Sequence, residues 1–224
     1  TKLEENEIGK YLGSLYNDVI IKDVMIRKGI TDEAMLKSVA NFALDNIGNL
    51  ISTNSIANTM TSDGRSINVR TVEKYLEGFI ESFFLYKANR YDIKGKQYLK
   101  TGEKYYVSDL GLRYFMLGRK VGDRGHILEN VVYLELLRNG YDVYVGKIDE
   151  FETDFVSQKG KETLYYQVAL TVRDENTLKR ELRPLTAVKD RYPKFVLTLD
   201  DDPEMQYDGI SIMNARDWLS EKTD

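Results

Sequence analysis

The spacing of the apolar residues changes once along this chain, and the change limits what the chain can fold into. Before residue 118, apolar side chains recur at the spacing of amphipathic helices. After the glycine-rich stretch 118–125, one more helical pattern leads into short runs rich in valine, tyrosine and phenylalanine, which are typical of strands. We therefore expect an α/β (α+β) chain of two modules, with a boundary at the glycine-rich stretch.

The first module has the order of elements found in a winged helix-turn-helix. Amphipathic helices are expected at 8–28, 31–47, 54–60 and 69–86, with a short helix at 109–118. Between the last two, residues 90–107 alternate tyrosine and apolar side chains with lysine around two glycines, which favours a β-hairpin or wing. Helix, short helix, turn and longer helix are the parts of a helix-turn-helix.

The second module predicts the order αβββαβ with a mixed sheet. Helices are expected at 126–139 and 175–192 and strands at 141–148, 151–157, 163–171 and 194–199, with an edge strand at 209–213 and a short helix around Trp218. A tight turn at 149–150 would pair Lys147 with Glu152. The same register would pair Val145 with Asp154 and place Lys147 on the same sheet face as Asp154, whereas a slip of one residue would reverse this.

The composition excludes several kinds of functional site. The chain has no cysteine, which rules out disulfides, thiolate zinc sites and a cysteine nucleophile and fits a reducing cytoplasm. Its single histidine, His126, rules out sites built from several imidazoles. No apolar run approaches the roughly 20 residues that span a bilayer, and the charged start is not a secretory signal. We therefore expect a cytoplasmic protein with no membrane partner.

Two carboxylates in the second module carry a resemblance to a nuclease fold. Glu129 lies on the helix that opens the module, and Asp154 lies in the strand that contains Glu-Thr-Asp-Phe-Val. This arrangement resembles the restriction-endonuclease-like fold known as PD-(D/E)XK, in which a helix glutamate and a strand aspartate bind a divalent metal. The next strand of that family brings an acid and a lysine as E-x-K, where this chain has Gln167 and Ala169.

The resemblance leaves two interpretations of these residues open. If the site is active, Glu129 and Asp154 hold Mg²⁺ or Mn²⁺, Gln167 offers an amide oxygen and Lys147 replaces the missing lysine, giving a metal-dependent DNA endonuclease. In the other interpretation, Glu129 and Asp154 are a remnant pair or plain surface acids. Gln167 brings no negative charge and Ala169 brings no ammonium to orient water, which favours an inactive fold.

Candidate contacts to DNA lie mainly in the first module, although the chain carries a formal net charge of −4. They are Arg70, Lys74, Lys94, Lys96, Lys100 and Lys104. The four hairpin lysines surround Tyr91 and Tyr98, and lysine with aromatic residues suits phosphate neutralisation and base stacking. The helix that carries Arg70 and Lys74 also carries three glutamates, so its face is close to neutral.

Other charged residues of the second module have plainer alternatives. Lys179, Arg180 and Arg183 share a helix and would reach a phosphate if that helix flanks the site, or else form a solvated helix face. The run Asp200–Asp202 is expected to be a turn. Because residues 125–224 hold 13 basic and 20 acidic residues, a protein-interaction module is a further hypothesis.

Three stretches together resemble the C-terminal region, a domain of unknown function, of prokaryotic AAA+ ATPases. They are 71–85 (TVEKYLEGFIESFFL), 104–112 (KYYVSDLGL) and 125–136 (GHILENVVYLEL) with 141–147 (YDVYVGK). In that family an ATPase domain precedes a winged helix and a nuclease-like domain. The resemblance implies a linker helix at 1–30 leading from a missing ATPase domain, a winged-helix domain at 31–118 and a nuclease-like domain at 125–224.

The expected function follows from that arrangement. The chain contains no G-x-x-x-x-G-K-[ST] loop, so it is not expected to bind or hydrolyse ATP by itself. We expect the C-terminal DNA-binding or effector module of an AAA+ ATPase, with an inactive nuclease-like fold. Its expected partners are DNA, the N-terminal ATPase domain of the full-length protein and, in the third hypothesis, another protein.

Overall fold

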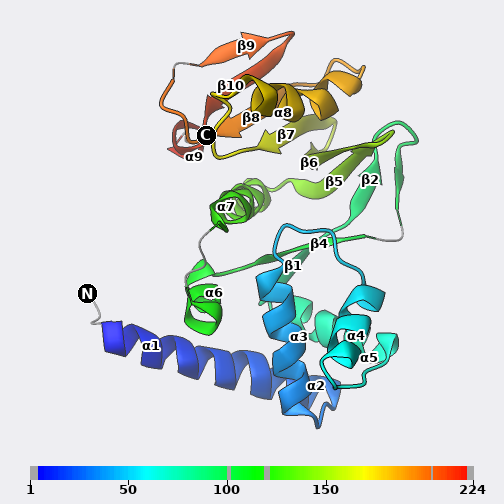
Figure 1. Cartoon of the computed structure of the whole chain (residues 1–224), viewed down its shortest axis with the longest axis vertical. Helices are drawn as coiled ribbons and strands as arrows, with labels where there is room; N and C mark the ends of the chain where they lie inside the picture. Colours follow the sequence, from blue (N-terminus) through cyan, green and yellow to red (C-terminus); the bar gives the residue numbers. More distant parts are fainter. Residues whose placement is uncertain (1–4, 100–101, 119–121, 203, 221–224) are drawn as a thin grey trace. The chain divides into compact units, whose positions relative to one another are not determined.

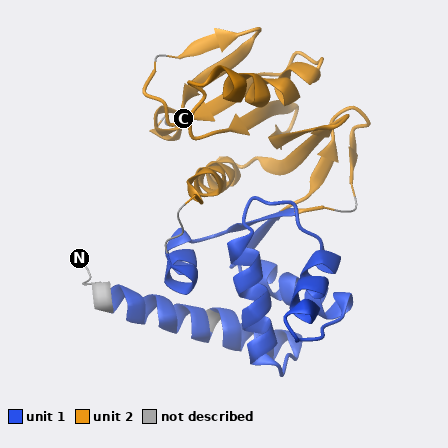
Figure 2. Ribbon diagram, viewed as in Figure 1, with its two compact units in different colours: residues 1–87, 104–121 blue, residues 88–103, 122–224 orange. Residues whose placement is uncertain are grey.

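The computed structural model describes residues 5–99, 102–118, 122–202 and 204–220, and it divides into two compact units (Figure 2). Unit 1 comprises residues 1–87 and 104–121, and unit 2 comprises 88–103 and 122–224. The hairpin that we expected in the winged helix is therefore divided, because residues 88–103 belong to the second unit. Among the described residues, no helix is long and apolar enough to cross a membrane.

Unit 1 is mainly helical, with one small sheet (Figure 1). Its helices are α1 (Glu5–Ser14), the π-helical η1 (Leu15–Lys22), α2 (Asp23–Lys28), α3 (Glu33–Asp45), α4 (Thr53–Ser62), α5 (Val69–Glu81) and α6 (Leu110–Leu117). Its strands are β1 (Leu85–Ala88) and β4 (Lys104–Val107), which pair with each other. The helix expected at 8–28 is thus one continuous helical run with a π-helical middle, and it ends at Gly29 with φ of 56°.

Side-chain caps set where the three central helices of unit 1 begin. The Asp32 carboxylate accepts a hydrogen bond from the Met35 backbone N–H at 2.8 Å, and the Asn68 amide oxygen accepts one from Thr71 N–H at 2.8 Å. Ser52 caps α4 in a reciprocal capping box. The apolar stripes of α3, α4 and α5 then pack into one core with η1 and α2. The order of a short helix (α4), a turn and a longer helix (α5) agrees with the order of elements expected from the spacing.

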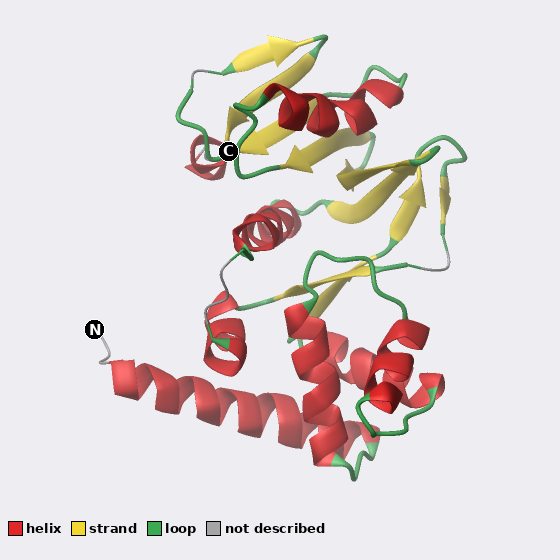
Figure 3. Cartoon of the chain, viewed as in Figure 1, coloured by secondary structure: helices red, strands yellow, loops and turns green. Residues whose placement is uncertain are grey.

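Unit 2 contains an eight-stranded mixed sheet (Figure 3). The strands are β2 (Arg90–Asp92), β3 (Gln97–Tyr98), β5 (Asp142–Ile148), β6 (Phe151–Lys159), β7 (Glu162–Val168), β8 (Lys194–Thr198), β9 (Met205–Tyr207) and β10 (Ile210–Asn214), and the helices are α7 (Arg124–Arg138), α8 (Glu175–Ala187) and α9 (Ala215–Ser220). The strand order is β3-β2-β5-β6-β7-β8-β10-β9. The expected edge strand, β10, lies inside the sheet, because it pairs with β8 in parallel and with β9 antiparallel.

Helices pack on both faces of this sheet, because successive side chains of its strands point to opposite faces. On one face, Tyr133 of α7 contacts Phe155, and Trp218 of α9 contacts Tyr166. The neighbouring strand residues Val156 and Tyr165 point the other way, into a core with α8. The sheet is therefore the middle layer between α8 on one side and α7 with α9 on the other.

The register between β5 and β6 agrees with the sequence only near the turn. Lys147 pairs with Glu152 as expected, with Asp149 at the turn in a left-handed conformation of φ 50°. The expected Val145–Asp154 pair is absent, because the register shifts between Tyr144 and Gly146. A shift of this kind is a β-bulge, which breaks strict alternation and turns a side chain away from the sheet normal.

Candidate functional site

Asp154 lies where β6 and β7 separate. The ladder between these strands reaches Phe155 paired with Tyr166 and no further toward Asp154. Beyond that pair, the Asp154 carboxylate accepts a hydrogen bond from the Val168 backbone N–H at 2.9 Å. The carboxylate thus satisfies an amide that the partner strand would otherwise pair. The bulge in β6 allows this, because Asp154 need not follow the facing of its neighbours.

Gln167 lies beside Asp154 and links it to a helix carboxylate. The Gln167 amide oxygen accepts a hydrogen bond from the Asp154 backbone N–H at 3.3 Å. Its amide nitrogen donates to Glu181 Oε2 at 2.9 Å. Arg180 donates from Nε and Nη2 to Glu181 Oε1, at 2.9 and 2.7 Å. The result is a chain of polar contacts running from β6 through β7 to α8.

Glu181 is a site residue that sequence reasoning missed. It is only 7% exposed, although it is charged. Its position gave a signal, because it falls between Leu178, Leu182 and Leu185 on the apolar stripe of α8 and must therefore face the sheet. A carboxylate on such a stripe needs a donor, and Gln167 with Arg180 supplies it.

Glu129 lies on α7, the helix that packs against β5, β6 and β7. Its side chain is 7% exposed, and its Oε2 lies 3.9 Å from His126 Nδ1. Of the alternatives left open for Glu129, a plain surface acid does not fit, since the carboxylate is buried. Lys147 is placed differently, between Asp92 and Glu152 as its partners in the two neighbouring strands. Because directly paired residues share a sheet face, Lys147 is flanked by two acidic residues.

Ala169 stands where the E-x-K pattern of the resembling nuclease fold has its lysine, and it is a core residue. Ala169 is 9% exposed and belongs to the apolar cluster that includes Val172 and Leu185. A lysine there would have to extend its ammonium out of this cluster. The structure thus gives a packing reason for the alanine that interrupts the E-x-K pattern.

The described residues contain no group of three histidine, aspartate or glutamate side chains that could hold a metal ion. Asp154 and Gln167 are brought into contact, and Glu181 joins them through Gln167. The Gln167 amide therefore has a backbone N–H of Asp154 at its oxygen and the Glu181 carboxylate at its nitrogen. Because both the oxygen and the nitrogen of this amide are hydrogen-bonded, Gln167 acts as a bridge that holds Asp154 and Glu181 in place.

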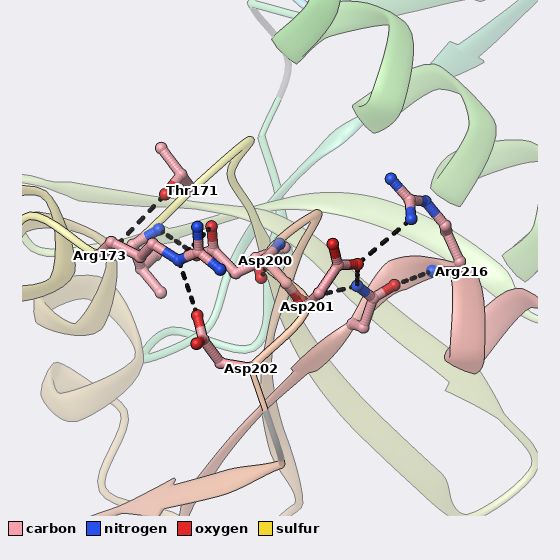
Figure 4. A network of polar contacts seen from close by, with 9 residues as sticks. Thr171, Arg173, Asp200, Asp201, Asp202 and Arg216 are labelled. Carbon is pink, nitrogen blue, oxygen red and sulfur yellow. Dashed lines mark hydrogen bonds and ion pairs between the residues drawn. The ribbon is translucent and has the colours of Figure 1, made fainter.

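The acidic run Asp200–Asp202 follows β8, and basic and amide groups engage each of its members (Figure 4). Asp200 accepts from Val172 N–H at 2.8 Å, Asp202 from Arg173 Nε at 2.8 Å, and Asp201 from Arg216 Nη1 at 3.3 Å. The run therefore holds the segment after β7 and the start of α9 to the end of β8. Residues 200–202 form an irregular segment after β8, and these contacts give that segment a structural role.

The hairpin lysines are less available than their spacing implied. Lys94 donates to Asp149 Oδ1 at 3.1 Å, and Lys104 is only 5% exposed. Lys100 lies outside the described residues. Lys96 is exposed in the turn between β2 and β3, with φ of 50°. A continuous lysine surface on this hairpin therefore does not follow from the structure.

Three tyrosines of the same region form a cluster in unit 2. Tyr91 pairs with Tyr98 across β2 and β3, and the ring centroids of Tyr98 and Tyr144 lie 5.2 Å apart. Burial, and then the Tyr98 hydroxyl 3.4 Å away, raises the pKa of Tyr144 far above its usual range. Tyr98 nevertheless keeps 61% of its surface exposed. The cluster fastens β3 to the sheet and leaves one aromatic face to solvent.

The candidate recognition helix α5 divides into two halves by charge. Glu77 and Glu81, in its C-terminal half, lie 3.6 and 2.7 Å from Lys28 Nζ of α2. The helices approach closely here, since a Cβ at Gly78 would lie 2.6 Å from Val24 Cγ1. Two of the three glutamates thus face α2, and the N-terminal half holds Arg70, Glu73 and Lys74, of which Lys74 donates to the backbone oxygen of Gly29 at the end of α2 at 3.4 Å.

A family model described as "Domain of unknown function (DUF8612)" matches residues 1–122. The chain belongs to this family. The DUF8612 match covers all the described residues of unit 1, together with β2 and β3 of unit 2, and ends before α7. The recognition of a domain of unknown function is thus confirmed at this coarser level.

Two relatives extend the similarity beyond the DUF8612 match. An uncharacterized protein of Haemophilus influenzae is 41% identical over 208 residues, which is 93% of this chain and 51% of the relative. An uncharacterized protein of Methanocaldococcus jannaschii is 29% identical over 197 residues, which is 85% of this chain and 43% of the relative. The chain spans about half the length of these relatives or less. No solved structure matches it significantly.

Proposed function

We propose that this chain is the nucleic-acid-binding part of a larger AAA+ ATPase, and that its nuclease-like half does not cleave DNA. One observation carries the proposal, namely the hydrogen-bonded bridge that Gln167 makes between Asp154 and Glu181. Where the resembling nucleases have a metal-binding acid, this chain has an amide whose two ends are already used. In this proposal, the PD-(D/E)XK-like half keeps the fold of a nuclease but lacks its catalytic activity.

The physical reason for the loss of cleavage is the charge at the fork between β6 and β7. Phosphodiester hydrolysis needs hard anionic ligands for Mg²⁺ and a cation close to the reacting phosphate. Gln167 contributes no charge, Ala169 is packed in an apolar core, and the Asp154 carboxylate is hydrogen-bonded to Val168 N–H. Each of these three positions has a structural use in this chain.

Binding of duplex DNA is assigned to the N-terminal half of α5. In helix-turn-helix proteins the first residues of the second helix meet the major groove. Here Asn68 caps the helix, and Arg70 and Lys74 follow on its first turns. Because Glu77 and Glu81 are held by Lys28, the exposed end of α5 carries a small basic surplus that the whole helix lacks.

The ATPase context rests on the sequence resemblance and on length. The relatives are about twice as long as this chain or more, which leaves room for a domain beyond the matched region. In the proposed arrangement, an N-terminal ATPase domain binds and hydrolyses ATP, and this chain contacts DNA. The whole protein acts in the cytoplasm of a prokaryote. The ATPase domain and DNA are the proposed partners.

The deciding experiment measures duplex binding and DNA cleavage with the same purified chain. Anisotropy of a labelled duplex, titrated with salt, should show affinity that falls as salt rises and that Arg70→Ala with Lys74→Ala weakens at least about fivefold. Lys10→Ala with Lys87→Ala removes the same charge from exposed sites outside α5 and should leave the affinity unchanged. The absence of any salt-dependent affinity for DNA would favour a protein-interaction module instead.

The alternative, a metal-dependent endonuclease, has one specific observation in its favour. Asp154 through its backbone N–H and Glu181 through its carboxylate both hydrogen-bond to the Gln167 amide, so two acidic residues adjoin one amide. Incubation of linear, single-stranded and branched DNA with Mg²⁺ or Mn²⁺ tests it. Cleavage that disappears in both Asp154→Ala and Glu129→Ala would establish the endonuclease. Intact DNA in every reaction would support the binding module.

A further inference from the structure

A groove along α8 in unit 2 combines cations with aromatic side chains. Its volume is about 500 Å³, within the range of ligand-binding clefts, and it is open to solvent. Lys179, Arg183 and Lys189 contribute three positive charges to its lining, and Asp208 contributes one negative charge. Phe151 and Tyr207 supply aromatic surface. This combination of charge and rings is typical of surfaces that bind single-stranded nucleic acids.

The cations of this groove are not consumed by internal ion pairs. Among the described residues, Arg183 makes no ion pair or hydrogen bond, and the Lys189 ammonium donates only to the Thr186 backbone oxygen at 3.1 Å. Lys179 pairs with Glu175, but both side chains are mostly exposed, so solvent weakens the pair. Arg180, the neighbouring arginine, binds Glu181 and is not part of the lining.

The positions of these groups are fixed by secondary structure. Lys179 and Arg183 are four residues apart on α8 and so share one side of the helix. Tyr207 is paired with Ile210 across a tight turn in which Asp208 and Gly209 have φ of 49° and 78°. Because Ile210 is buried, this turn is anchored, and Tyr207 is held with 49% of its surface exposed.

We propose that the α8 groove binds a segment of single-stranded DNA, with phosphates on Arg183, Lys189 and Lys179 and a base stacked on Tyr207. An open groove suits a strand that passes through it better than an enclosed nucleotide. The inference rests on the proposed nucleic-acid-binding function and adds a second surface for a different form of DNA. Duplex contacts by α5 and strand contacts by α8 would then lie in different units.

The test is binding of a fluorescently labelled oligothymidine of about 12 nucleotides to the whole chain, since single-strand sites cover roughly 4–16 nucleotides. Arg183→Glu should weaken binding at least about tenfold at low salt and lower the slope of log affinity against log salt by about 0.7 for each phosphate that is no longer neutralised. Lys161→Glu makes the same charge change at an exposed turn outside the groove and should alter affinity less than about twofold. Equal effects of the two substitutions, or none, would overturn the proposal.

Two further arms define the ligand and separate the proposals. Tyr207→Ala should weaken oligothymidine at least about fivefold and an abasic strand much less, because only the strand with bases can stack on the ring. Thymidine monophosphate that competes as well as the oligomer would replace the strand with a free nucleotide and overturn the inference. Arg183→Glu should leave duplex affinity unchanged. Arg70→Ala with Lys74→Ala should leave oligothymidine affinity unchanged, so either proposal can fail alone.

Discussion

The Asp154 carboxylate accepts a hydrogen bond from the Val168 backbone N–H at 2.9 Å, just beyond the last paired residues of β6 and β7. In the resembling nucleases an aspartate at this position serves a metal ion. In this chain it closes the fork between two strands of the sheet. This hydrogen bond gives Asp154 a structural role that requires no metal ion.

Asp154→Ala is expected to destabilise the chain. The substitution leaves the half-buried Val168 N–H without its acceptor, and an unmet buried donor costs about 1–3 kcal/mol. Chemical denaturation followed by circular dichroism measures the loss. Asp154→Asn is the matched control, since its amide oxygen still accepts the bond, and it should lose clearly less. A loss of equal size in both variants would mean that charge, and not the hydrogen bond, matters here.

Gln167→Glu is expected to lower stability by about 1–3 kcal/mol, because it replaces the donor that faces Glu181 Oε2 with a second carboxylate. The double variant Gln167→Glu with Glu181→Gln restores one donor and one carboxylate in reversed order. It should therefore recover most of the loss in a double-mutant cycle. Additive losses in the double variant would contradict the bridge described above. Gain of Mg²⁺-dependent cleavage in Gln167→Glu would point to a latent nuclease site.

Much of the fold could be predicted from the sequence because periodicity reports burial. The order of the helices of unit 1 and most strands of unit 2 were predicted in this way. Two predicted ends were wrong. The strand expected at 163–171 ends at Val168, and the helix expected at 175–192 ends at Ala187. In both cases the chain leaves the element while its side chains remain apolar or charged as before, so periodicity gives no stop signal.

Long-range choices were beyond the sequence. The segment 88–103 has hairpin chemistry, but its strand β2 pairs in parallel with β5 of unit 2. The antiparallel pairing of β2 with β3 has the local form of a hairpin, whereas nothing local indicates β5 as a second, parallel partner. The bulge opposite Val145 is equally non-local, and it decides where the Asp154 side chain points. The burial of Glu181, in contrast, could have been predicted, because the sequence places it on the apolar stripe of α8.

Gly78→Ala should destabilise unit 1 by about 1–3 kcal/mol, although alanine is the better helix former. An added Cβ would lie 2.6 Å from Val24 Cγ1, and Val24 is fully buried and cannot move aside freely. Gly9→Ala is the control, since no atom outside its own helix lies within 4 Å of the added Cβ. It should raise stability by about 0.5–1 kcal/mol. Denaturant midpoints of the two variants compare these opposite signs, and equal shifts would rule out close packing of α2 and α5.

Tyr141 makes stability depend on alkaline pH. Burial, and then its hydrogen bond to Glu162 Oε2 at 2.7 Å, raises the pKa of Tyr141 to about 12. In the unfolded chain the hydroxyl ionises near its ordinary pKa of about 10. Because the folded pKa is the higher one, the stabilisation is fully present below pH 10 and is lost as the pH rises toward 12.

Tyr141→Phe removes this dependence and so tests its sign. At pH 8 the variant should be the less stable protein, because it lacks the hydrogen bond to Glu162. As the pH rises from 10 to 12, the wild-type chain loses the contribution of Tyr141 and the variant does not, so the gap between their denaturation midpoints should narrow. Glu162→Gln keeps an acceptor but removes its charge, and it should narrow the window by bringing the Tyr141 pKa nearer its ordinary value. A gap that stays constant across this range would show that Tyr141 holds its proton no more tightly in the folded chain than in the unfolded one.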